Sequence, residues 1–176
     1  MRYREALTEA MRLCAEQPNS VFLGQAVRFD GTGMYGTLEK VPMERRIEMP
    51  VAEEMQLGIS TGLALAGALP VSIFPRINFL MRAMDQLVNH LDKLELMSRG
   101  KGWKPKVIVR TAVGARHPLD PGAQHTGNYC DAVRAMLGNV NVWELEQTSQ
   151  IIPSYQDALA SDISTILVEH HGAYGT

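Results

Sequence analysis

The sequence lacks several features that identify whole classes of protein. Its 176 residues include only two cysteines, Cys14 and Cys130, which are far apart and have no CxxC spacing. Such a pair suits reduced, structural thiols better than a redox pair or a zinc site. No apolar run approaches the roughly 20 residues that a membrane span needs, and "MRYREALTEAMRLC" lacks the apolar core of a signal peptide. We therefore expect a cytoplasmic protein without a membrane partner.

The sequence also lacks an excess of charge of one sign. Lysine and arginine number 17, aspartate and glutamate 19, and the formal net charge is -2. Because nucleic-acid binding rests on neutralising phosphates with basic side chains, we expect no nucleic-acid partner. With 45% hydrophobic residues, residues 1–176 fit one globular domain with its own core.

Patterns typical of strands and helices alternate along the chain. Strands are expected at "SVFLGQAV", "RRIEMPV", "PVSIF", "KPKVIVRTAV", "VNVWEL" and "STILVEH". Helices are expected over 3–16, 53–68 and 80–94, with a short one near "YCDAVRAML" and only a brief turn at "SYQDALAS". The alternation predicts an α/β fold of three layers, with helices on both faces of a mostly parallel sheet. Ligands of such sheets bind beyond the carboxyl ends of the strands.

Two short motifs match known signatures without their structural context. "GTGMYG", over 31–36, has the GxGxxG spacing of a dinucleotide site, but Pro42 breaks the next segment, where a helix would be needed, so a flexible loop is the better interpretation. "GISTG" has the GxSxG spacing of a hydrolase nucleophile elbow, but Ser60 lies inside a helical pattern that begins at Glu53. There Gly58 and Gly62 indicate close packing against a neighbour.

Two adjacent acids, Glu53 and Glu54, stand between a proline-marked apolar stretch and a run rich in Gly, Ala, Leu and Met. Acids at a helix start are favoured by the helix dipole, which is a sufficient reason for them. A carboxylate in an apolar pocket is the alternative, because desolvation lets it share a proton near neutral pH. Of the histidines, His125 is better placed for a site than His90, although an ordinary polar loop is an equal alternative.

Five segments in order resemble the N-terminal, pyrimidine-binding domain of the β subunit of thiamine-diphosphate-dependent 2-oxo acid dehydrogenases, within the wider transketolase-like family. They are "MRYREAL", "MPVAEEMQLGISTGLALAGALPV", "NFLMRAMDQLVNH", "GAQHTGNY" and "LVEHHGAYG". Each segment is a weak signal, but together they span nearly the whole chain.

The resemblance implies roles for three residues. Glu53 falls on the catalytic glutamate that hydrogen-bonds the N1′ atom of the cofactor's aminopyrimidine and promotes the imino tautomer, and Glu54 is its accessory neighbour. Phe79 matches the aromatic residue that packs against the pyrimidine, a contact worth about 0.5 to 1.5 kcal/mol beyond burial. His125 matches the histidine above the reacting carbon, where an acid or base of neutral pH is useful.

The chain also departs from the family pattern. Pro75 and Arg76 replace apolar or hydroxyl residues, and "ARHPLDP" replaces a glycine-rich stretch. We infer a different substrate pocket that prefers an anionic group near Arg76, Arg116 or His117. The sequence ends where the family's β subunit continues into a C-terminal domain, which we expect to be absent.

The diphosphate and Mg²⁺ of thiamine diphosphate are held in the family by a GDG motif and a distant Asn pair, and the sequence has neither GDG nor NN. The resemblance therefore implies half an active site, with Mg²⁺ ligands supplied by a diphosphate-binding α-type partner in an α2β2-like heterotetramer. The expected function is decarboxylation, or two-carbon or acyl transfer, on a 2-oxo acid or ketose, as a transferase, carboligase or oxidoreductase. The alternatives are a non-catalytic regulatory subunit and a serine hydrolase that uses Ser60.

Overall fold

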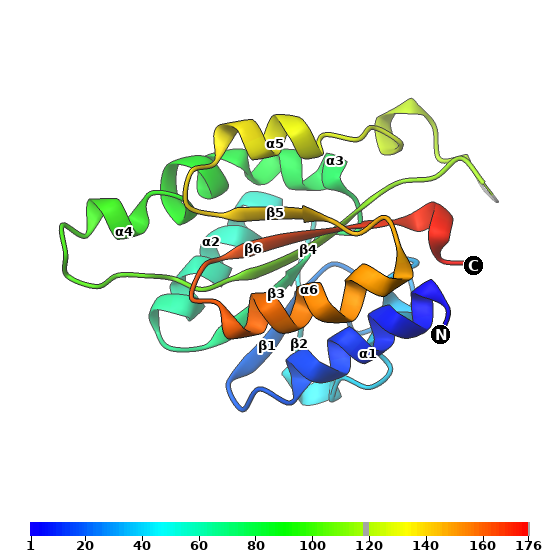
Figure 1. The fold of residues 1–176 in the computed structure, drawn as a ribbon, viewed down its shortest axis with the longest axis horizontal. Helices are drawn as coiled ribbons and strands as arrows, with labels where there is room; N and C mark the ends of the chain where they lie inside the picture. Colours follow the sequence, from blue (N-terminus) through cyan, green and yellow to red (C-terminus); the bar gives the residue numbers. More distant parts are fainter. Residues whose placement is uncertain (118–119, 176) are drawn as a thin grey trace.

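The structure is a computed structural model in which residues 1–117 and 120–175 are described. Six parallel strands form one sheet in the order β2-β1-β3-β4-β6-β5 (Figure 1). They are β1 (Ser20–Gly24), β2 (Arg46–Glu48), β3 (Leu69–Ile73), β4 (Ile108–Val113), β5 (Asn141–Glu144) and β6 (Thr165–His170). All six expected strands are present, and the predicted three-layer α/β fold is confirmed.

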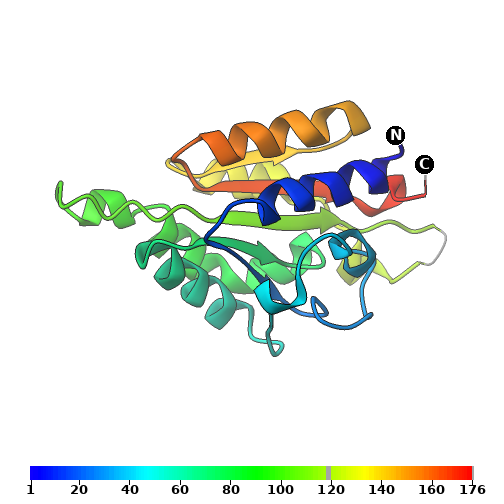
Figure 2. The same ribbon diagram turned by 90° about the horizontal axis from the view of Figure 1, so that it is seen from below.

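Helices cover both faces of the sheet. On one face lie α1 (Tyr3–Ala15) and α6 (Thr148–Ala160), and on the other α2 (Glu53–Leu65), α3 (Ile77–Leu80) and α5 (Cys130–Met136). Figure 2 shows α1 and α6 together above the sheet and α2 below it. Every residue of β3 and β4 is buried, as expected for central strands with both faces covered.

Each face has its own hydrophobic core. The spacing that predicts the first helix puts Leu7, Met11 and Cys14 on its buried side, where they pack with Tyr155 of α6. The opposite core contains Leu57 of α2, with residues of α3, α5 and the strands. The sheet thus separates two apolar cores, and packing on both of its faces holds the six strands in place.

Two predicted helices are wrong in extent. The expected brief turn near "SYQDALAS" is instead the 13-residue α6, with Pro153 inside it. An interior proline costs about 3 kcal/mol, but Ile151, Tyr155 and Ala158 are buried on the α1 side, and burial of that kind contributes enough to offset the cost. A proline therefore does not end this helix.

The expected single helix over 80–94 is divided. It consists of α3, the 3₁₀ turn η3 (Met81–Ala83), the π-helical η4 (Gln86–Leu91) and α4 (Leu94–Met97). At the end of η4 the buried Asp92 accepts backbone N–H groups of Gly138 and Asn139 at 2.9 and 2.7 Å. The predicted apolar face is correct, since Leu80, Leu87 and Leu91 are buried. The change from α-helix to 3₁₀ and π-helix along this segment is not encoded in that spacing, and it coincides with the tertiary contact of Asp92.

The segment over 29–45, which includes the "GTGMYG" motif expected to form a flexible loop, is packed against the rest of the protein. It contains the 3₁₀ turns η1 (Tyr35–Leu38) and η2 (Met43–Arg45), and Met34, Leu38 and Val41 join the α1 core. The buried Arg46 guanidinium donates to the carbonyl oxygens of Val41, Leu38 and Val27. No α-helix comes after "GTGMYG" within the segment, so the dinucleotide-site context is absent there.

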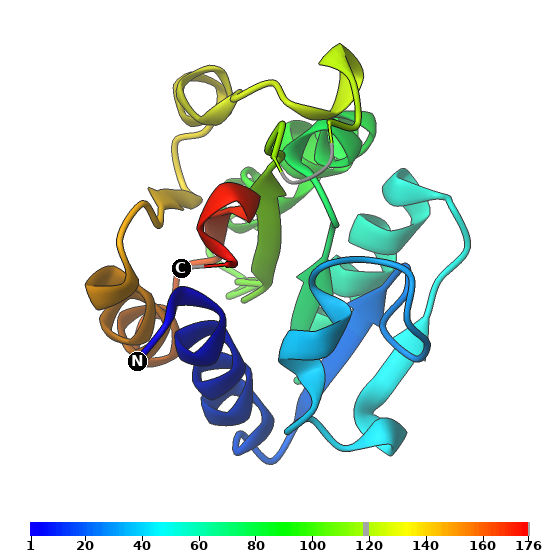
Figure 3. The same ribbon diagram turned by 90° about the vertical axis from the view of Figure 1, so that its right-hand side faces the viewer.

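The carboxyl ends of all six strands meet at one edge. The strand arrows of Figure 1 point toward the side that faces the viewer in Figure 3, where the loop after β1, the loop after β4 and the 3₁₀ turn η6 (His171–Ala173) gather. Both termini lie on this side (Figure 1). Side chains from distant parts of the chain therefore converge here.

Candidate functional site

Glu53 is a buried carboxylate at the first turn of α2. Its side chain is 3% exposed, whereas Glu54 beside it is exposed. Glu53 lines a pocket of about 690 Å³ together with Val51, Met55, Ile59 and others. Of the two adjacent acids, only Glu53 thus combines burial with access to a cavity.

The side-chain contacts of the Glu53 carboxylate are long. Gln25 Nε2 donates to Glu53 Oε1 at 3.3 Å, and Arg82 Nε lies 3.4 Å from Glu53 Oε2. The Arg82 side chain is 74% exposed, so solvent screens this ion pair and its contribution is small. The carboxylate consequently retains the capacity to accept a further, shorter hydrogen bond.

Glu48, at the end of β2, fixes the loop that presents Gln25. Its carboxylate accepts the backbone N–H groups of Ala26, Val27 and Arg28 at 2.6 to 3.0 Å. Ala26 has φ of 52°, an unusual conformation for a residue with a Cβ. Three charge-assisted hydrogen bonds stabilise this turn, and through it the position of Gln25 beside Glu53.

The buried Gln56, one turn after Glu53, ties α2 to the carboxyl ends of β1 and β3. Its amide donates to Ser72 Oγ at 3.1 Å and to the Ile73 carbonyl at 3.0 Å. Sequence reasoning missed both Gln25 and Gln56, because a polar residue at the end of a predicted strand or near a predicted helix start gives no signal of what it contacts across the sheet.

Phe79 and His125 lie together in a second pocket of about 350 Å³ at the same edge, which Arg76 and His171 also line. Their rings are edge to face, with centroids 5.5 Å apart and an interplanar angle of 70°. His125 Nδ1 is buried without a hydrogen-bond partner in the described part of the chain. The two residues predicted from separate segments are therefore brought into contact.

Glu53 lines the first pocket and not the second. The segment formed by α3 and η3 connects the two pockets. Phe79 of this segment lines the second pocket, and Arg82, three residues later, lines the first. The structure places Phe79 and His125 in one pocket and Glu53 in a neighbouring one, joined by four residues of helical chain.

The three residues expected near a substrate differ in position. Arg76 lines the second pocket and also a third of about 590 Å³, and His117 lines that third one. Arg116 is exposed and lines none of these three pockets. The loop that carries Arg116 and His117 continues into Pro118 and Leu119, which lie outside the described residues.

Ser60 does not have the geometry of a nucleophile elbow. It is fully buried inside α2, and its hydroxyl donates to the Gln56 carbonyl at 2.8 Å. A hydrolase serine must stand exposed on a strand-to-helix turn, so the hydrolase alternative is wrong. The expected close packing occurs only at Gly58, which faces Gln86. Apart from the adjacent residues and the backbone of α2 itself, no heavy atom of the described chain lies within 4 Å of a Cβ at Gly62.

A buried polar network lies under the same edge, on the α1 and α6 side. Arg110 of β4 forms a bidentate ion pair with Glu169 of β6, and both side chains are 0% exposed. Glu169 also accepts the hydroxyls of Tyr155 and Tyr174. Burial, reinforced by the Glu169 charge, raises the pKa of Tyr174 well above its ordinary value, so this hydroxyl keeps its proton and donates it.

His171, directly beyond β6, adjoins this network and was missed by sequence reasoning. Its ring lies edge to face with Tyr174, with centroids 4.9 Å apart, and it lines the second and third pockets. Burial lowers the pKa of His171 to about 4, with a smaller contribution from nearby Arg76 and Arg110. The only sequence signal was its place at the end of a strand.

Metal ligation and membrane spanning both lack support within the described residues. No group of three His, Cys, Asp or Glu side chains among residues 1–117 and 120–175 is arranged to hold a metal ion. None of the helices in those ranges has the length and apolarity needed to cross a bilayer.

The sequence matches a known family over its whole length. Residues 1–176 match the family described as transketolase, pyrimidine binding domain. The pyruvate dehydrogenase E1 component subunit beta of Rickettsia bellii is 36% identical over 179 residues, covering 98% of this chain and 53% of the relative. The mitochondrial subunit beta of Rattus norvegicus is 30% identical over 182 residues, covering 98% and 48%. The chain thus spans about half the length of these relatives.

Solved structures share the fold at lower identity. A split-gene transketolase described as an inactive beta4 tetramer superposes with a TM-score of 0.69 at 19% identity, covering 96% of this chain and 50% of that one. A transketolase from Campylobacter jejuni gives 0.71 at 16%, covering 94% and 25%. The fold and the sequence comparisons agree. The chain belongs to the transketolase pyrimidine-binding domain family and is similar to the β subunits of pyruvate dehydrogenase E1.

Proposed function

We propose that this chain supplies the pyrimidine-binding half of a thiamine-diphosphate site, completed by a diphosphate-binding partner subunit. The observation that carries the proposal is Glu53: a 3% exposed carboxylate that lines a pocket and keeps hydrogen-bonding capacity. Burying such a group has a large desolvation cost, and a ligand nitrogen that shares its proton would compensate that cost.

The residues present fit the aminopyrimidine end of the cofactor. Glu53 offers an acceptor, Phe79 offers an aromatic face, and His125 has a buried Nδ1 without a partner among the described residues. The bound cofactor would supply a nucleophilic carbon that adds to a carbonyl and then acts as an electron sink. Glu53 would hold a proton between its carboxylate and the ring nitrogen, and His125 would move a proton near the reacting carbon.

The Mg²⁺ end of the cofactor does not fit the described residues. A cation that bridges diphosphate oxygens needs carboxylate and amide oxygens, and no group of three His, Cys, Asp or Glu side chains among residues 1–117 and 120–175 is arranged to hold a metal ion. The proposal therefore assigns the Mg²⁺ ligands to the partner, in an α2β2-like assembly.

The surface around Glu53 supports such a partner. Around the first pocket, the side chains of Val51, Met55 and Ile59 are 78%, 45% and 40% exposed. Gly62 lies on the same face of α2, and no side chain of the described residues covers it. Large apolar side chains grouped beside a buried acid are typical of a surface that another chain covers. The R. bellii relative, named as an E1 subunit, and the tetrameric split transketolase are consistent with assembly.

The substrate expected from this arrangement is a 2-oxo acid or ketose, with decarboxylation or two-carbon or acyl transfer as the reaction. Arg76 and His117 line the cavities where a negatively charged substrate group would be bound, and Arg116 stays a prediction from its place in the same loop.

A test of the catalytic role replaces Glu53 in the reconstituted complex. Glu53→Gln keeps the shape but removes the proton-accepting charge, so the rate should fall by about 10² to 10⁴. Glu44→Gln, at an exposed position of η2, is the matched control and should leave the rate unchanged. Unchanged turnover in Glu53→Gln would remove this residue from the acid/base role and favour a non-catalytic, regulatory subunit instead.

A second test addresses the partner. The chain is purified with its natural partner, and the complex is assayed for bound thiamine diphosphate by mass spectrometry. We expect cofactor in the complex and neither tight binding nor turnover by the chain alone. Full turnover by residues 1–176 without a partner would refute the half-site proposal.

A further inference from the structure

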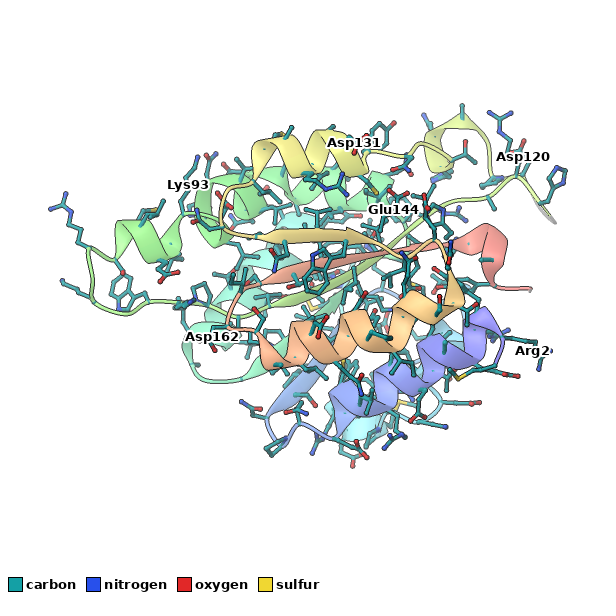
Figure 4. All side chains as sticks on the ribbon, in the orientation of Figure 1. Arg2, Lys93, Asp120, Asp131, Glu144 and Asp162 are labelled. Atoms are coloured by element: carbon teal, nitrogen blue, oxygen red, sulfur yellow. The ribbon has the colours of Figure 1, made fainter. Side chains whose placement is uncertain are left out.

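The segment after η4 forms an arm that projects from the body of the protein. This arm, residues 93–106, contains α4 and the loop that leads toward β4. In Figure 1 and Figure 2 it lies at the end of the molecule opposite the two termini, and Figure 4 labels Lys93 and Asp162 at this end, away from Arg2 and Asp120. Because the six strands run toward the termini, the arm lies at the amino-terminal edge of the sheet, away from the candidate site.

The arm exposes large apolar side chains. Leu96, Met97 and Trp103 are 66%, 61% and 54% exposed. Single exposed apolar side chains are ordinary, but three within one short segment are typical of a surface that another molecule covers. Tryptophan and methionine are among the residue types that are enriched in protein–protein interfaces. The arm therefore has the composition of a docking surface.

The turn that carries Trp103 is held in shape by its own contacts. The buried Ser98 donates its hydroxyl to the Glu95 carbonyl at 2.7 Å. Gly100 and Gly102 have φ of 81° and 77°, a conformation that glycine adopts without steric cost. A turn that is already ordered loses less conformational entropy when it binds, so it presents Trp103 to a partner at a low free-energy cost.

The arm is also a basic part of a chain that is acidic overall. Residues 93–106 contain five basic side chains and one acidic side chain, whereas the whole chain has a formal net charge of -2. Arg99, Lys101 and Lys104 are exposed, and none of the ion pairs among the described residues includes them. Their positive charge therefore remains uncompensated and would attract a negatively charged partner.

We propose that the arm is a docking site for an acidic segment of a further protein, one that carries apolar side chains beside its carboxylates. The apolar side chains would pack on Trp103, and the carboxylates would pair with Lys101 and Lys104. An anionic membrane would attract the same cations, but the remainder of the chain has an excess of acidic groups that such a surface repels, which favours a protein. The inference is independent of the proposed function, because the arm and the candidate site lie at opposite edges of the sheet.

The test measures the binding of a defined acidic probe to the full chain. The probe is a fluorescein-labelled helical peptide of glutamate, leucine and alanine, about four turns long, and its anisotropy is followed as the chain is added. We expect saturable binding that weakens as the salt concentration rises. Trp103→Ala should weaken binding by about tenfold or more, because tryptophan is a frequent anchor of interfaces. Lys101→Gln combined with Lys104→Gln should weaken it by a similar factor.

Matched controls separate the arm from other exposed surfaces. Phe29→Ala removes an aromatic side chain of similar exposure, 57%, and Lys40→Gln neutralises a lysine at another exposed position. Both variants should bind the peptide as the native chain does. A peptide with lysine in place of glutamate should not bind, and one with alanine in place of leucine should bind weakly. Binding should persist when the chain is in the reconstituted complex with its diphosphate-binding partner.

Several outcomes would overturn the inference. They are absence of binding by the acidic peptide, equal weakening by the control variants, and loss of binding in the reconstituted complex, which would assign the arm to the diphosphate-binding partner. Binding of phosphatidylglycerol vesicles or of a single-stranded oligonucleotide through Trp103, in preference to the peptide, would assign it to a lipid surface or a nucleic acid. Self-association that Trp103→Ala abolishes would assign it to a second copy of this chain. Circular dichroism confirms that each variant is folded, and should Trp103→Ala not fold, the lysine variant decides the question.

Discussion

Gly114, the residue after β4, decides where His125 lies. A Cβ at this position would be 1.8 Å from the His125 carbonyl oxygen and 2.8 Å from Arg76 Nη1. Only a residue without a side chain lets the loop carrying His125 approach the end of the strand so closely. Gly114 thus brings His125 within reach of both Phe79 and Arg76.

Gly114→Ala should displace His125 and lower turnover of the reconstituted complex. A shift of about 1 Å at a catalytic group can cost on the order of 10²-fold in rate, and overpacking should reduce stability by about 1 to 3 kcal/mol. The rate and the urea midpoint measure the two effects. Gly138→Ala, where no atom of the described residues other than its two chain neighbours lies within 4 Å of the added Cβ, is the control and should change neither. Equal rates in the two variants would contradict this role of Gly114.

At the scale of elements, α6 and the segment from α3 to α4 show how packing overrides local preference. Pro153 lies on the exposed side of α6, while Ile151, Tyr155 and Ala158 are buried against α1. Gln150 supports the helix start by accepting the Gln147 backbone N–H at 2.8 Å. The helix therefore persists through a residue that disfavours it.

Pro153→Ala should stabilise the protein. The change restores a backbone donor inside α6 and relieves the ring's clash with the preceding turn, a gain of about 1 to 3 kcal/mol. The midpoint of urea unfolding should rise. Pro18→Ala, in the exposed turn after α1, should instead lower stability slightly, by about 0.4 to 1 kcal/mol. The reason is that removing this proline raises the conformational entropy of the unfolded chain without changing a helix. A fall in stability for Pro153→Ala would show that Pro153 does not destabilise α6.

At the scale of the whole molecule, the Glu169 network joins parts that are distant in sequence. Tyr3 of α1 donates to the Leu145 carbonyl at 2.5 Å and accepts the His170 N–H at 3.1 Å, beside the contacts of Glu169 with β4, α6 and Tyr174. Both ends of the chain are therefore tied to the edge of the sheet that forms the site.

Glu169→Gln should destabilise the whole fold by about 3 to 5 kcal/mol, because Arg110 would be left as an uncompensated buried charge. Chemical denaturation measures the loss. Glu146→Gln, at an exposed position after β5, should change stability little. A loss below about 1 kcal/mol in Glu169→Gln would show that the ion pair does not contribute as argued.

The stability of the protein should depend on pH through His171. Its pKa is about 4 when folded and lies near 6.5 when unfolded. The unfolded state therefore binds the proton first, so the contribution of His171 to stability falls as the pH decreases from about 6.5 to 4 and changes no further below that. The loss has an upper limit of about 3 kcal/mol. Urea unfolding at pH 7 and pH 5 should show a larger difference for the native chain than for His171→Gln, and equal differences would contradict the assignment.

The sequence by itself determined the α/β class, the six strands, the spacing of the buried residues in α1 and the family to which the chain belongs. These features follow from local periodicity and residue order, which the sequence carries directly. Only the tertiary structure decided that Glu53 is buried while Glu54 is not, that α6 continues through Pro153, and that His171 faces the pocket of His125. Each depends on contacts between residues far apart in the chain, where the free energy of burial and pairing exceeds the local preference that a pattern can reveal.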